Sequence, residues 1–169
     1  MVKREIRSQI MELFDGPTLS VLATVSRRGR PWTRYVMSRI DGDLTLRIPT
    51  RSSTRKVGDI QHFPFVHVLV GKNLFERGGA YAQIEGRASL TQNAASLGRF
   101  WYDGMTRFFS GPDDPSYLLI EVRPERIEYW SMSEAENPHV LEEEDLAPVG
   151  LPFDDELSPN FLPSEYAPT

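Results

Sequence analysis

The sequence contains no cysteine, only three histidines and no long uninterrupted apolar run. The absence of cysteine excludes disulfide frameworks, thiol nucleophiles, iron–sulfur clusters and cysteine-based zinc sites. No stretch approaches the roughly 18 apolar residues that a membrane-spanning helix needs. Residues 1–14 alternate charged and apolar side chains, unlike the continuous apolar segment of a signal peptide. We therefore expect a soluble, cytoplasmic protein with no membrane partner.

Positive charge is absent from the end of the chain and concentrated at its start. Residues 1–56 carry 12 Lys and Arg against 5 Asp and Glu, whereas residues 131–169 carry 10 Asp and Glu and no Lys or Arg. The overall net charge of −5 argues against a nucleic-acid partner, because nucleic-acid-binding domains are usually strongly basic. The acidic, proline-rich composition of the last segment predicts a tail over residues 132–169 that follows one folded domain over residues 1–131.

Hydrophobic periodicity predicts a mainly β (α+β) domain with flanking helices. Apolar residues at helical spacing predict helices over residues 2–14 and 93–109, and a short helix is expected before Pro64. Apolar runs bounded by turn residues predict strands over residues 19–26, 30–40, 44–49, 65–71, 80–91, 117–123 and 126–130. Gly86 inside the fifth of these suggests a bulge or a bend. Six or seven antiparallel strands without βαβ units favour a small barrel.

The most informative segment lies where the third predicted strand gives way to a helix. There Ser52, Ser53 and Thr54 supply hydroxyl groups directly before Arg55 and Lys56. Cations are unfavourable at a helix N-terminus, where the backbone N–H groups already attract anions. A bound phosphate would reverse this conflict by accepting charge-assisted hydrogen bonds from the hydroxyls, the backbone and both cations. A solvated basic helix start is the alternative interpretation.

The order and spacing of four short motifs resemble the pyridoxamine 5′-phosphate oxidase-like flavin proteins, and in particular the branch of general stress protein 26. The resemblance covers roughly residues 8–131. The motifs that carry it are Arg34…Arg39, Pro49-Thr50, Thr54-Arg55-Lys56 and Ile127-Glu128-Tyr129-Trp130. It implies a six- to seven-stranded antiparallel split β-barrel and a homodimer with one FMN per subunit at the subunit interface.

The resemblance also implies which residues contact FMN. Arg55 and Lys56 would clamp the phosphate and Thr54 would donate from its hydroxyl, while Trp130 would approach the ring from the neighbouring subunit. Pro49-Thr50 would contact the ribityl chain or the phosphate. The strand with Arg34, Tyr35, Val36, Met37 and Arg39 would follow the isoalloxazine edge. Arg34 and Arg39 are an odd number of residues apart, so a regular strand puts them on opposite faces.

One departure from the family pattern concerns the substrate. Family members that oxidise pyridoxamine phosphate carry arginines soon after the motif tryptophan, whereas no Lys or Arg follows Trp130 here. An acidic segment repels a phosphorylated substrate, so we do not expect that activity. The resemblance implies an FMN-dependent oxidoreductase whose small-molecule substrate or electron donor is unknown, and we name no catalytic residue.

Three alternatives remain open at this point. The barrel could hold the deazaflavin F420 or haem, although the Thr54-Arg55-Lys56 cluster favours FMN. The protein could also bind flavin as a stress protein without turnover. We predict no metal site, because His62 and His67 are separated by a helix–strand break and a metal needs three or four converging ligands.

Overall fold

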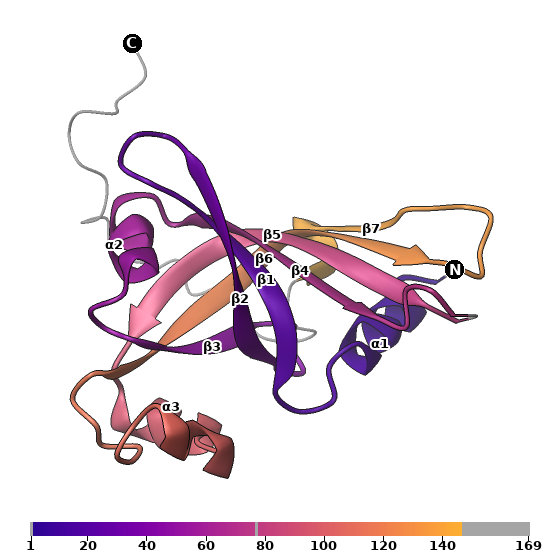
Figure 1. Cartoon of the computed structure of the whole chain (residues 1–169). Helices are drawn as coiled ribbons and strands as arrows, with labels where there is room; N and C mark the ends of the chain where they lie inside the picture. The colour runs from indigo at the N-terminus through magenta and orange to yellow at the C-terminus, as the bar shows by residue number, and fades with distance from the viewer. Residues whose placement is uncertain (1, 77, 147–169) are drawn as a thin grey trace.

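Seven antiparallel strands make up the largest part of the residues that the computed structural model describes, which are 2–76 and 78–146 (Figure 1). They are β1 (Thr18–Val25), β2 (Pro31–Ile40), β3 (Leu46–Arg51), β4 (Phe65–Lys72), β5 (Ala80–Thr91), β6 (Tyr117–Ser131) and β7 (His139–Glu142). The sheet order is β3-β2-β1-β4-β5-β6-β7, and an additional pairing of β3 with β6 closes six strands into a barrel. The predicted mainly β split barrel is therefore confirmed.

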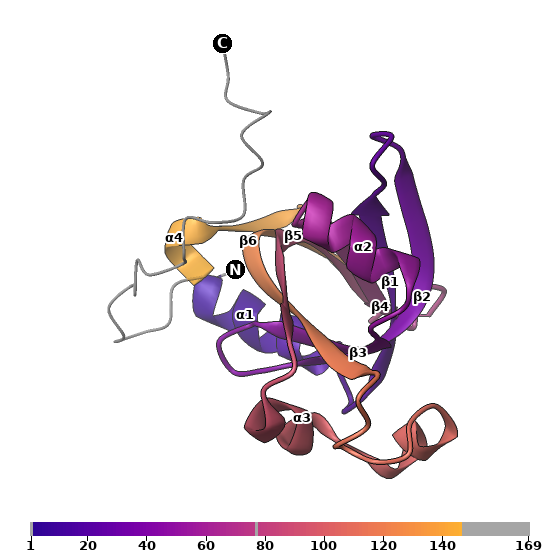
Figure 2. The same ribbon diagram turned by 90° about the vertical axis from the view of Figure 1, so that its left-hand side faces the viewer.

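Short helices surround this barrel. They are α1 (Lys3–Glu12), α2 (Arg55–His62), α3 (Ala94–Phe100), the 3-10 helix η1 (Asp103–Arg107) and α4 (Glu143–Leu146). Figure 2 looks into the barrel: α2 lies across its upper edge, in contact with β1 and β5, and α3 lies outside it below β3. The two helices therefore pack against different parts of the same barrel.

Strand β6 is the longest strand, and it continues through a proline. The sequence predicts two strands on either side of Pro124, and this prediction is wrong because β6 runs unbroken from Tyr117 to Ser131. The β5–β6 register shifts between Glu85 and Gly86, so that Glu125 has no partner on β5. This bulge, expected at Gly86, accommodates a residue that cannot donate to the ladder. A Cβ on Gly86 would lie 2.4 Å from the Arg123 carbonyl oxygen.

The predicted helix over residues 93–109 is wrong in its length. Asn93 caps α3 by accepting from the backbone N–H groups of Ala95 and Ser96, but the helix ends at Phe100 and the chain turns into η1. The turn buries Phe109 instead of Phe108, whose side chain is 59% exposed. Residues of both short helices pack in one cluster with Tyr117 and Leu119 of β6.

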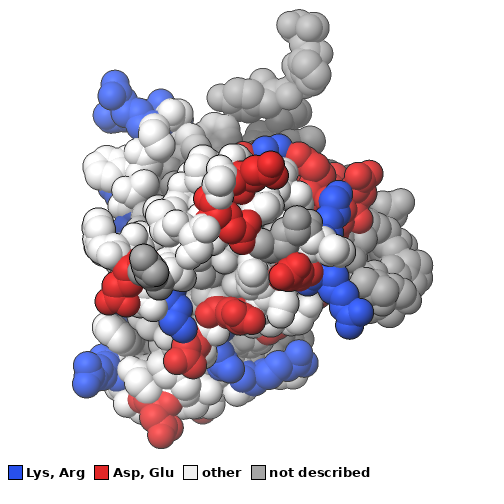
Figure 3. Space-filling view, turned by 90° about the vertical axis from the view of Figure 1, so that its right-hand side faces the viewer, with Lys and Arg blue, Asp and Glu red and all other residues white. Residues whose placement is uncertain are grey.

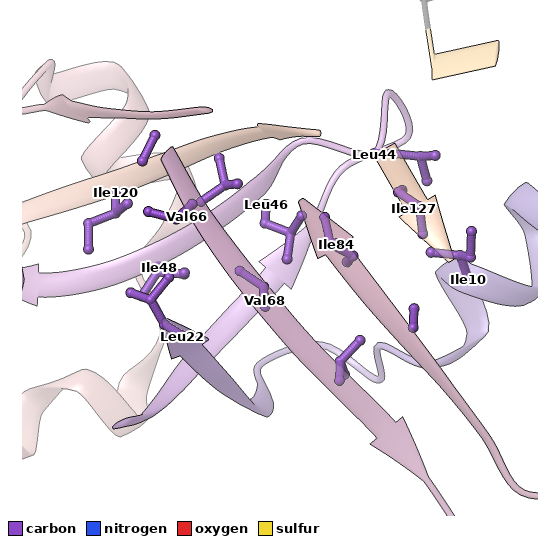
Figure 4. Packing of buried hydrophobic residues seen from close by; sticks show 14 of the residues in the cluster. Ile10, Leu22, Leu44, Leu46, Ile48, Val66, Val68, Ile84, Ile120 and Ile127 are labelled. Carbon is purple, nitrogen blue, oxygen red and sulfur yellow. The ribbon is translucent and has the colours of Figure 1, made fainter. Parts of the chain in front are cut away.

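The barrel interior is filled by aliphatic side chains from every strand (Figure 4). Leu22, Leu46 and Val68 point inward from three different strands, and none is exposed to solvent. Ile10 of α1 closes the end of the barrel near Leu44 and Ile127 (Figure 4). A second cluster, outside the barrel, joins α3 and η1 to the start of β6.

The acidic segment after Ser131 begins within this fold. Strand β7 pairs with the second half of β6, and the Asp145 carboxylate of α4 accepts a 2.6 Å hydrogen bond from Lys3 Nζ of α1. On this side of the molecule acidic side chains are interspersed with Lys and Arg (Figure 3). The remainder of the predicted tail, residues 147–169, lies outside the described residues. No helix in the described part of the chain is both long and apolar enough to cross a membrane.

Candidate functional site

The turn between β3 and α2 is built by its own hydroxyl groups. Thr54 Oγ1 donates to the Arg51 carbonyl oxygen at 2.9 Å and lies 3.2 Å from Thr50 Oγ1. Val57 and Ile60 are buried, which fixes α2 on the barrel. The first turn of α2 contains no acidic residue, and the Thr54 side chain makes no capping hydrogen bond. The positive end of this helix is therefore left without a negative charge.

Arg34 reaches the same region from β2. Its guanidinium donates to Thr24 Oγ1 at 2.7 Å and to the Leu22 carbonyl oxygen at 3.3 Å. The Thr24 hydroxyl in turn donates to Asp59 of α2 at 2.8 Å, and Arg34 forms an ion pair of 3.6 Å with the same carboxylate. Thr24 and Asp59 are both buried, so these bonds hold the Arg34 guanidinium next to α2.

The pKa values show that these cations repel one another in a partly dehydrated place. Burial lowers the pKa of the Lys56 ammonium, and the neighbouring Arg34 guanidinium lowers it further. Burial also lowers the pKa of Arg34, against the attraction of Asp59 and together with repulsion from Arg55. Both charged forms therefore cost free energy in the protein as it stands, and a nearby anion would relieve this cost.

We call Arg34, Arg55, Lys56 and Asp59 the α2 cluster. Among the described residues, Asp59 is the only carboxylate that pairs with any of its three cations. Arg55 instead lies over the Trp32 ring, 3.9 Å from the centroid. The cluster therefore carries an excess of two positive charges, which matches the charge of a phosphate dianion.

The other predicted contacts divide between the two faces of β2. The β1–β2 register is continuous, and Arg34 and Arg39 lie on opposite faces, as predicted from their odd separation. Arg39 lies 5.3 Å from the centroid of the Phe100 ring. Val36 is buried in the core, whereas Tyr35 is 75% exposed and Met37 half-buried on the outer face. Of the residues predicted on this strand to contact FMN, only Arg34 thus reaches the α2 cluster within one chain.

Two more predicted residues lie beside the α2 cluster. Thr50 is buried next to Thr54, and Pro49 precedes it on β3, opposite Leu119 of β6. These positions allow Thr50 to line the approach to the cluster from β3.

Trp130 lies at the other end of β6. Its ring stacks on Tyr81 with centroids 5.8 Å apart, and its Nε1 is buried without a hydrogen-bond partner in the described structure. Trp130 is twelve residues beyond Leu118, a separation of up to roughly 40 Å along an extended strand. A single chain therefore does not bring Trp130 to the α2 cluster, and the predicted contact with FMN needs a second subunit.

A pocket of about 490 Å³ lies on the other side of the start of α2. Thr54 lines it, together with residues from α2, the end of β5 and the start of β6, but Arg55 and Lys56 do not. Thr54 is therefore the residue that connects the α2 cluster to the pocket.

Sequence reasoning missed Thr24 and Asp59, the buried pair that positions Arg34. Asp59 lies four residues after Arg55, and this spacing places the two on one side of a helix. That spacing is a usable signal for Asp59. Nothing local in the sequence pairs Thr24 with α2, because their contact depends on closure of the barrel. No group of three or more metal-ligating side chains gathers within residues 2–76 and 78–146.

Comparison with known proteins gives consistent matches over the barrel. A family model described as pyridoxamine 5′-phosphate oxidase matches residues 6–131. General stress protein 26 of Bacillus subtilis (strain 168) is 32% identical over 134 residues, which cover 79% of this chain and 94% of that protein. The crystal structure of General Stress Protein 26 from Bacillus anthracis str. Sterne is similar with a TM-score of 0.70 and 29% identity, over 82% of this chain and 98% of that one.

More distant structures share the fold. A heme binding protein from Mycobacterium smegmatis has a TM-score of 0.67 at 12% identity. The match covers 86% of this chain and 60% of that chain. An F420 reductase has a TM-score of 0.54 at 24% identity, and the match covers 69% of this chain and 93% of that chain. Because the family match extends from α1 to the end of β6, this chain belongs to the pyridoxamine 5′-phosphate oxidase family.

Proposed function

We propose that this protein binds FMN and acts as an FMN-dependent oxidoreductase. The α2 cluster carries the proposal, because three cations, of which Arg34 and Lys56 are partly buried, share a single carboxylate and so favour a dianion. The uncapped start of α2 adds backbone N–H groups that favour the same ligand. Membership of a family that commonly binds flavin supports FMN as the source of the phosphate.

In this proposal the protein's own residues bind and orient the cofactor. Arg34, Arg55 and Lys56 donate to the phosphate, and the hydroxyls of Thr50 and Thr54 lie beside it. The pairing of Thr24 with Asp59 fixes Arg34 before the ligand arrives, which reduces the entropy lost on binding. Bound FMN itself would supply the redox chemistry.

We further propose that the protein is a homodimer. The outer faces of β1, β2 and β4 expose Leu19, Tyr35 and Leu69, and the strand pairing places Val21 between Tyr35 and Leu69. A contiguous apolar area of this kind is typical of an interaction surface. A second copy would cover it and would bring the partner's Trp130 to a flavin ring lying along β2.

The substrate is not pyridoxamine phosphate in this proposal. No Lys or Arg occurs from Ser131 to the end of the chain, and Glu134 pairs with His139 directly after the barrel. A phosphorylated substrate would meet negative charge where it needs a cation. We propose an unphosphorylated substrate or electron donor.

The first test is the spectrum and mass of the small molecule that copurifies with the protein. We expect a yellow protein with the two absorption bands of a flavin and the mass of FMN. A single deazaflavin band would support F420, and a Soret band would support haem. A colourless protein that fails to take up added FMN would contradict the proposal.

Catalysis needs a separate measurement. We expect the FMN-loaded protein to oxidise at least one reductant in a screen that includes NADH and NADPH. If FMN binds but no donor is oxidised, the protein is a flavin-binding stress protein without turnover.

A further inference from the structure

The turn between β1 and β2 presents three arginines to solvent. The Ser26 N–H donates to the Arg30 carbonyl oxygen, and the Gly29 N–H donates to that of Ser26. Gly29 has a φ of 70°, which a tight turn of this kind requires. The β1–β2 hairpin projects beyond the barrel (Figure 1 and Figure 2). We call its exposed cations, Arg27, Arg28 and Arg30, the hairpin cluster.

The hairpin cluster has no compensating charge in the described part of the chain. Within residues 2–76 and 78–146, no carboxylate forms an ion pair with any of its three arginines. Like charges so close in sequence repel one another, and an anion placed among them removes this repulsion. The hairpin cluster is separate from the α2 cluster, so a dianion bound by the latter does not neutralise it.

An exposed tryptophan continues the hairpin cluster toward α2. The side chain of Trp32 is 45% exposed, and the Arg55 guanidinium lies over its ring. Trp32 and Arg34 are two residues apart on β2, so their side chains share one face of the strand. Arginine and tryptophan are both enriched at protein–protein interfaces. The surface therefore suits a polypeptide segment that combines carboxylates with apolar side chains.

The chain itself contains such a segment. Asp154, Asp155 and Glu156 are consecutive, and they lie between Phe153 and Leu157. Their three carboxylates equal the three cations of the hairpin cluster in number, and no Lys or Arg occurs from Ser131 to the end of the chain. Three acidic residues earlier in this part of the chain already have partners in the fold, namely Glu134 with His139, Glu142 with Arg126 and Asp145 with Lys3.

We propose that residues 154–156 of one copy of this chain bind the hairpin cluster of a second copy. This segment lies outside the described residues, and the proposal rests on its charge and on its distance along the chain from α4. The contact does not depend on the bound cofactor, and it adds a second contact to the proposed homodimer. Two-fold symmetry would repeat it, because each copy has one hairpin and one acidic segment.

The barrel topology favours a second copy over the same chain. Strand β1 is three strands from β6 in either direction around the barrel, so the hairpin and α4, which packs on β6 and β7, lie on opposite sides (Figure 2). Eight residues lead from Leu146 of α4 to Asp154, and they span about 29 Å at most. This short connection hinders a path around the barrel, whereas a second copy approaches the hairpin directly.

The first test uses zero-length cross-linking, which joins a lysine amine to a carboxylate only where the two are in contact. The variant Arg27→Lys with Arg28→Lys keeps the charge of the hairpin cluster and makes it reactive. Arg99→Lys with Arg107→Lys makes the same change at exposed positions of α3 and η1 and is the control. All four positions are exposed, so both variants are expected to fold.

Each variant is prepared as an equal mixture of 15N-labelled and unlabelled copies. We expect mass spectrometry to find links from positions 27 and 28 to residues 154–156 that join a labelled to an unlabelled copy, and no such links from the control positions. The ion pair of Lys3 with Asp145 is the internal standard, because it should give a link in every sample.

The second test measures the dimer dissociation constant by light scattering on dilution. The neutral variant carries Asp154→Asn, Asp155→Asn and Glu156→Gln, and the matched control carries Glu143→Gln, Glu144→Gln and Glu165→Gln. We expect the neutral variant to raise the dissociation constant by about tenfold, because several exposed ion pairs are lost together. The matched control should change it little. The FMN affinity of the dimer should be the same in both, since the hairpin cluster lies outside the α2 cluster.

Four results would overturn the inference. They are links found only within one copy, equal links from the control positions, an unchanged dissociation constant of the neutral variant, and binding of a single-stranded oligonucleotide by the hairpin cluster without any link to residues 154–156. The last result would make nucleic acid the partner of this surface. A protein that is monomeric at all concentrations would contradict the proposed homodimer as well, whereas a dimer without these links would contradict the inference alone.

Discussion

Two arginine clusters lie on opposite faces of β2 and differ in their charge balance. On one face, the α2 cluster has three cations and one carboxylate. On the other face, Arg39 and Arg47 both lie over the Phe100 ring, and Arg47 forms ion pairs with Asp41 and Glu121. We call the latter group the β3 cluster, and its two cations are matched by two carboxylates.

This difference separates a binding site from a structural network. A balanced cluster stabilises the fold and has no unmet need for an anion. An unbalanced cluster that is partly buried costs free energy until a ligand supplies the missing charge. Such a cost is typical of sites prepared for a ligand. The following experiments test this distinction, beginning with the largest expected effect.

Removing two cations from the α2 cluster should remove most of the affinity for FMN. We expect Arg55→Ala with Lys56→Ala to weaken FMN by about 3 kcal/mol or more, because each hydrogen bond to a charged group contributes about 1.5–3 kcal/mol. Fluorescence titration measures this loss. Arg27→Ala with Arg28→Ala makes the same change in net charge in an exposed turn and is the control. Equal affinities for all three proteins would place the phosphate elsewhere.

Removing the carboxylate of the α2 cluster should destabilise the protein without ligand. Asp59→Asn leaves the partly buried Arg34 without its ion pair, and loss of one partner of a buried pair costs about 3–5 kcal/mol. Urea denaturation should therefore show a lower free energy of unfolding. Added phosphate should restore more stability to this variant than to wild type, and a variant as stable as wild type would show that the pair contributes nothing.

The β3 cluster should contribute to stability but not to FMN binding. Arg47→Met keeps the apolar stem but loses two ion pairs, so we expect a loss of stability of about 1–2 kcal/mol. FMN affinity, corrected for the folded fraction, should not change. A large loss of affinity would mean that both faces of β2 contribute to one phosphate site, and the comparison would fail.

Trp130 tests whether a third region joins the site across a dimer interface. We expect Trp130→Ala to weaken FMN by about 1 kcal/mol, since an aromatic contact contributes about 0.5–1.5 kcal/mol. Titration at several protein concentrations, with the mass measured by light scattering, separates lost stacking from lost dimerisation. An unchanged affinity would show that the stacked pair with Tyr81 has only a structural role.

The smallest effect concerns pH. Because the Lys56 pKa is lowered in the folded protein, the unfolded chain binds more protons between that pKa and the ordinary value near 10.5. The free energy of unfolding of the ligand-free protein should therefore rise with pH through this interval, and Lys56→Met should reduce the rise. Bound phosphate would raise the Lys56 pKa, so it should also reduce the rise in the free energy of unfolding with pH. Urea denaturation from about pH 8 to about pH 10 measures both slopes, and identical slopes for wild type and variant would contradict the assignment.

Local sequence patterns were sufficient for most strands but not for all boundaries. The fifth predicted strand, residues 80–91, coincides with β5, and Gly86 correctly indicated its bulge. The interruption expected at Pro124 was wrong, because β6 tolerates this proline beside its own bulge at Glu125, and the sequence of one strand does not show how it pairs with its neighbour. The helix expected over residues 93–109 was wrong in its length, because its apolar spacing does not show that the chain leaves the helix after Phe100 and packs Met105 and Phe109 with Tyr117 of β6.

The sequence by itself determined the barrel strands, the unusual hydroxyl–cation segment before α2, and the opposite orientation of Arg34 and Arg39. Each of these follows from periodicity or from neighbouring residues. Only the tertiary structure decided which charges are compensated: it brought Thr24 and Asp59 to Arg34, gave Arg47 two carboxylates, and separated Trp130 from the α2 cluster. Charge compensation depends on contacts between distant segments, and barrel closure creates those contacts.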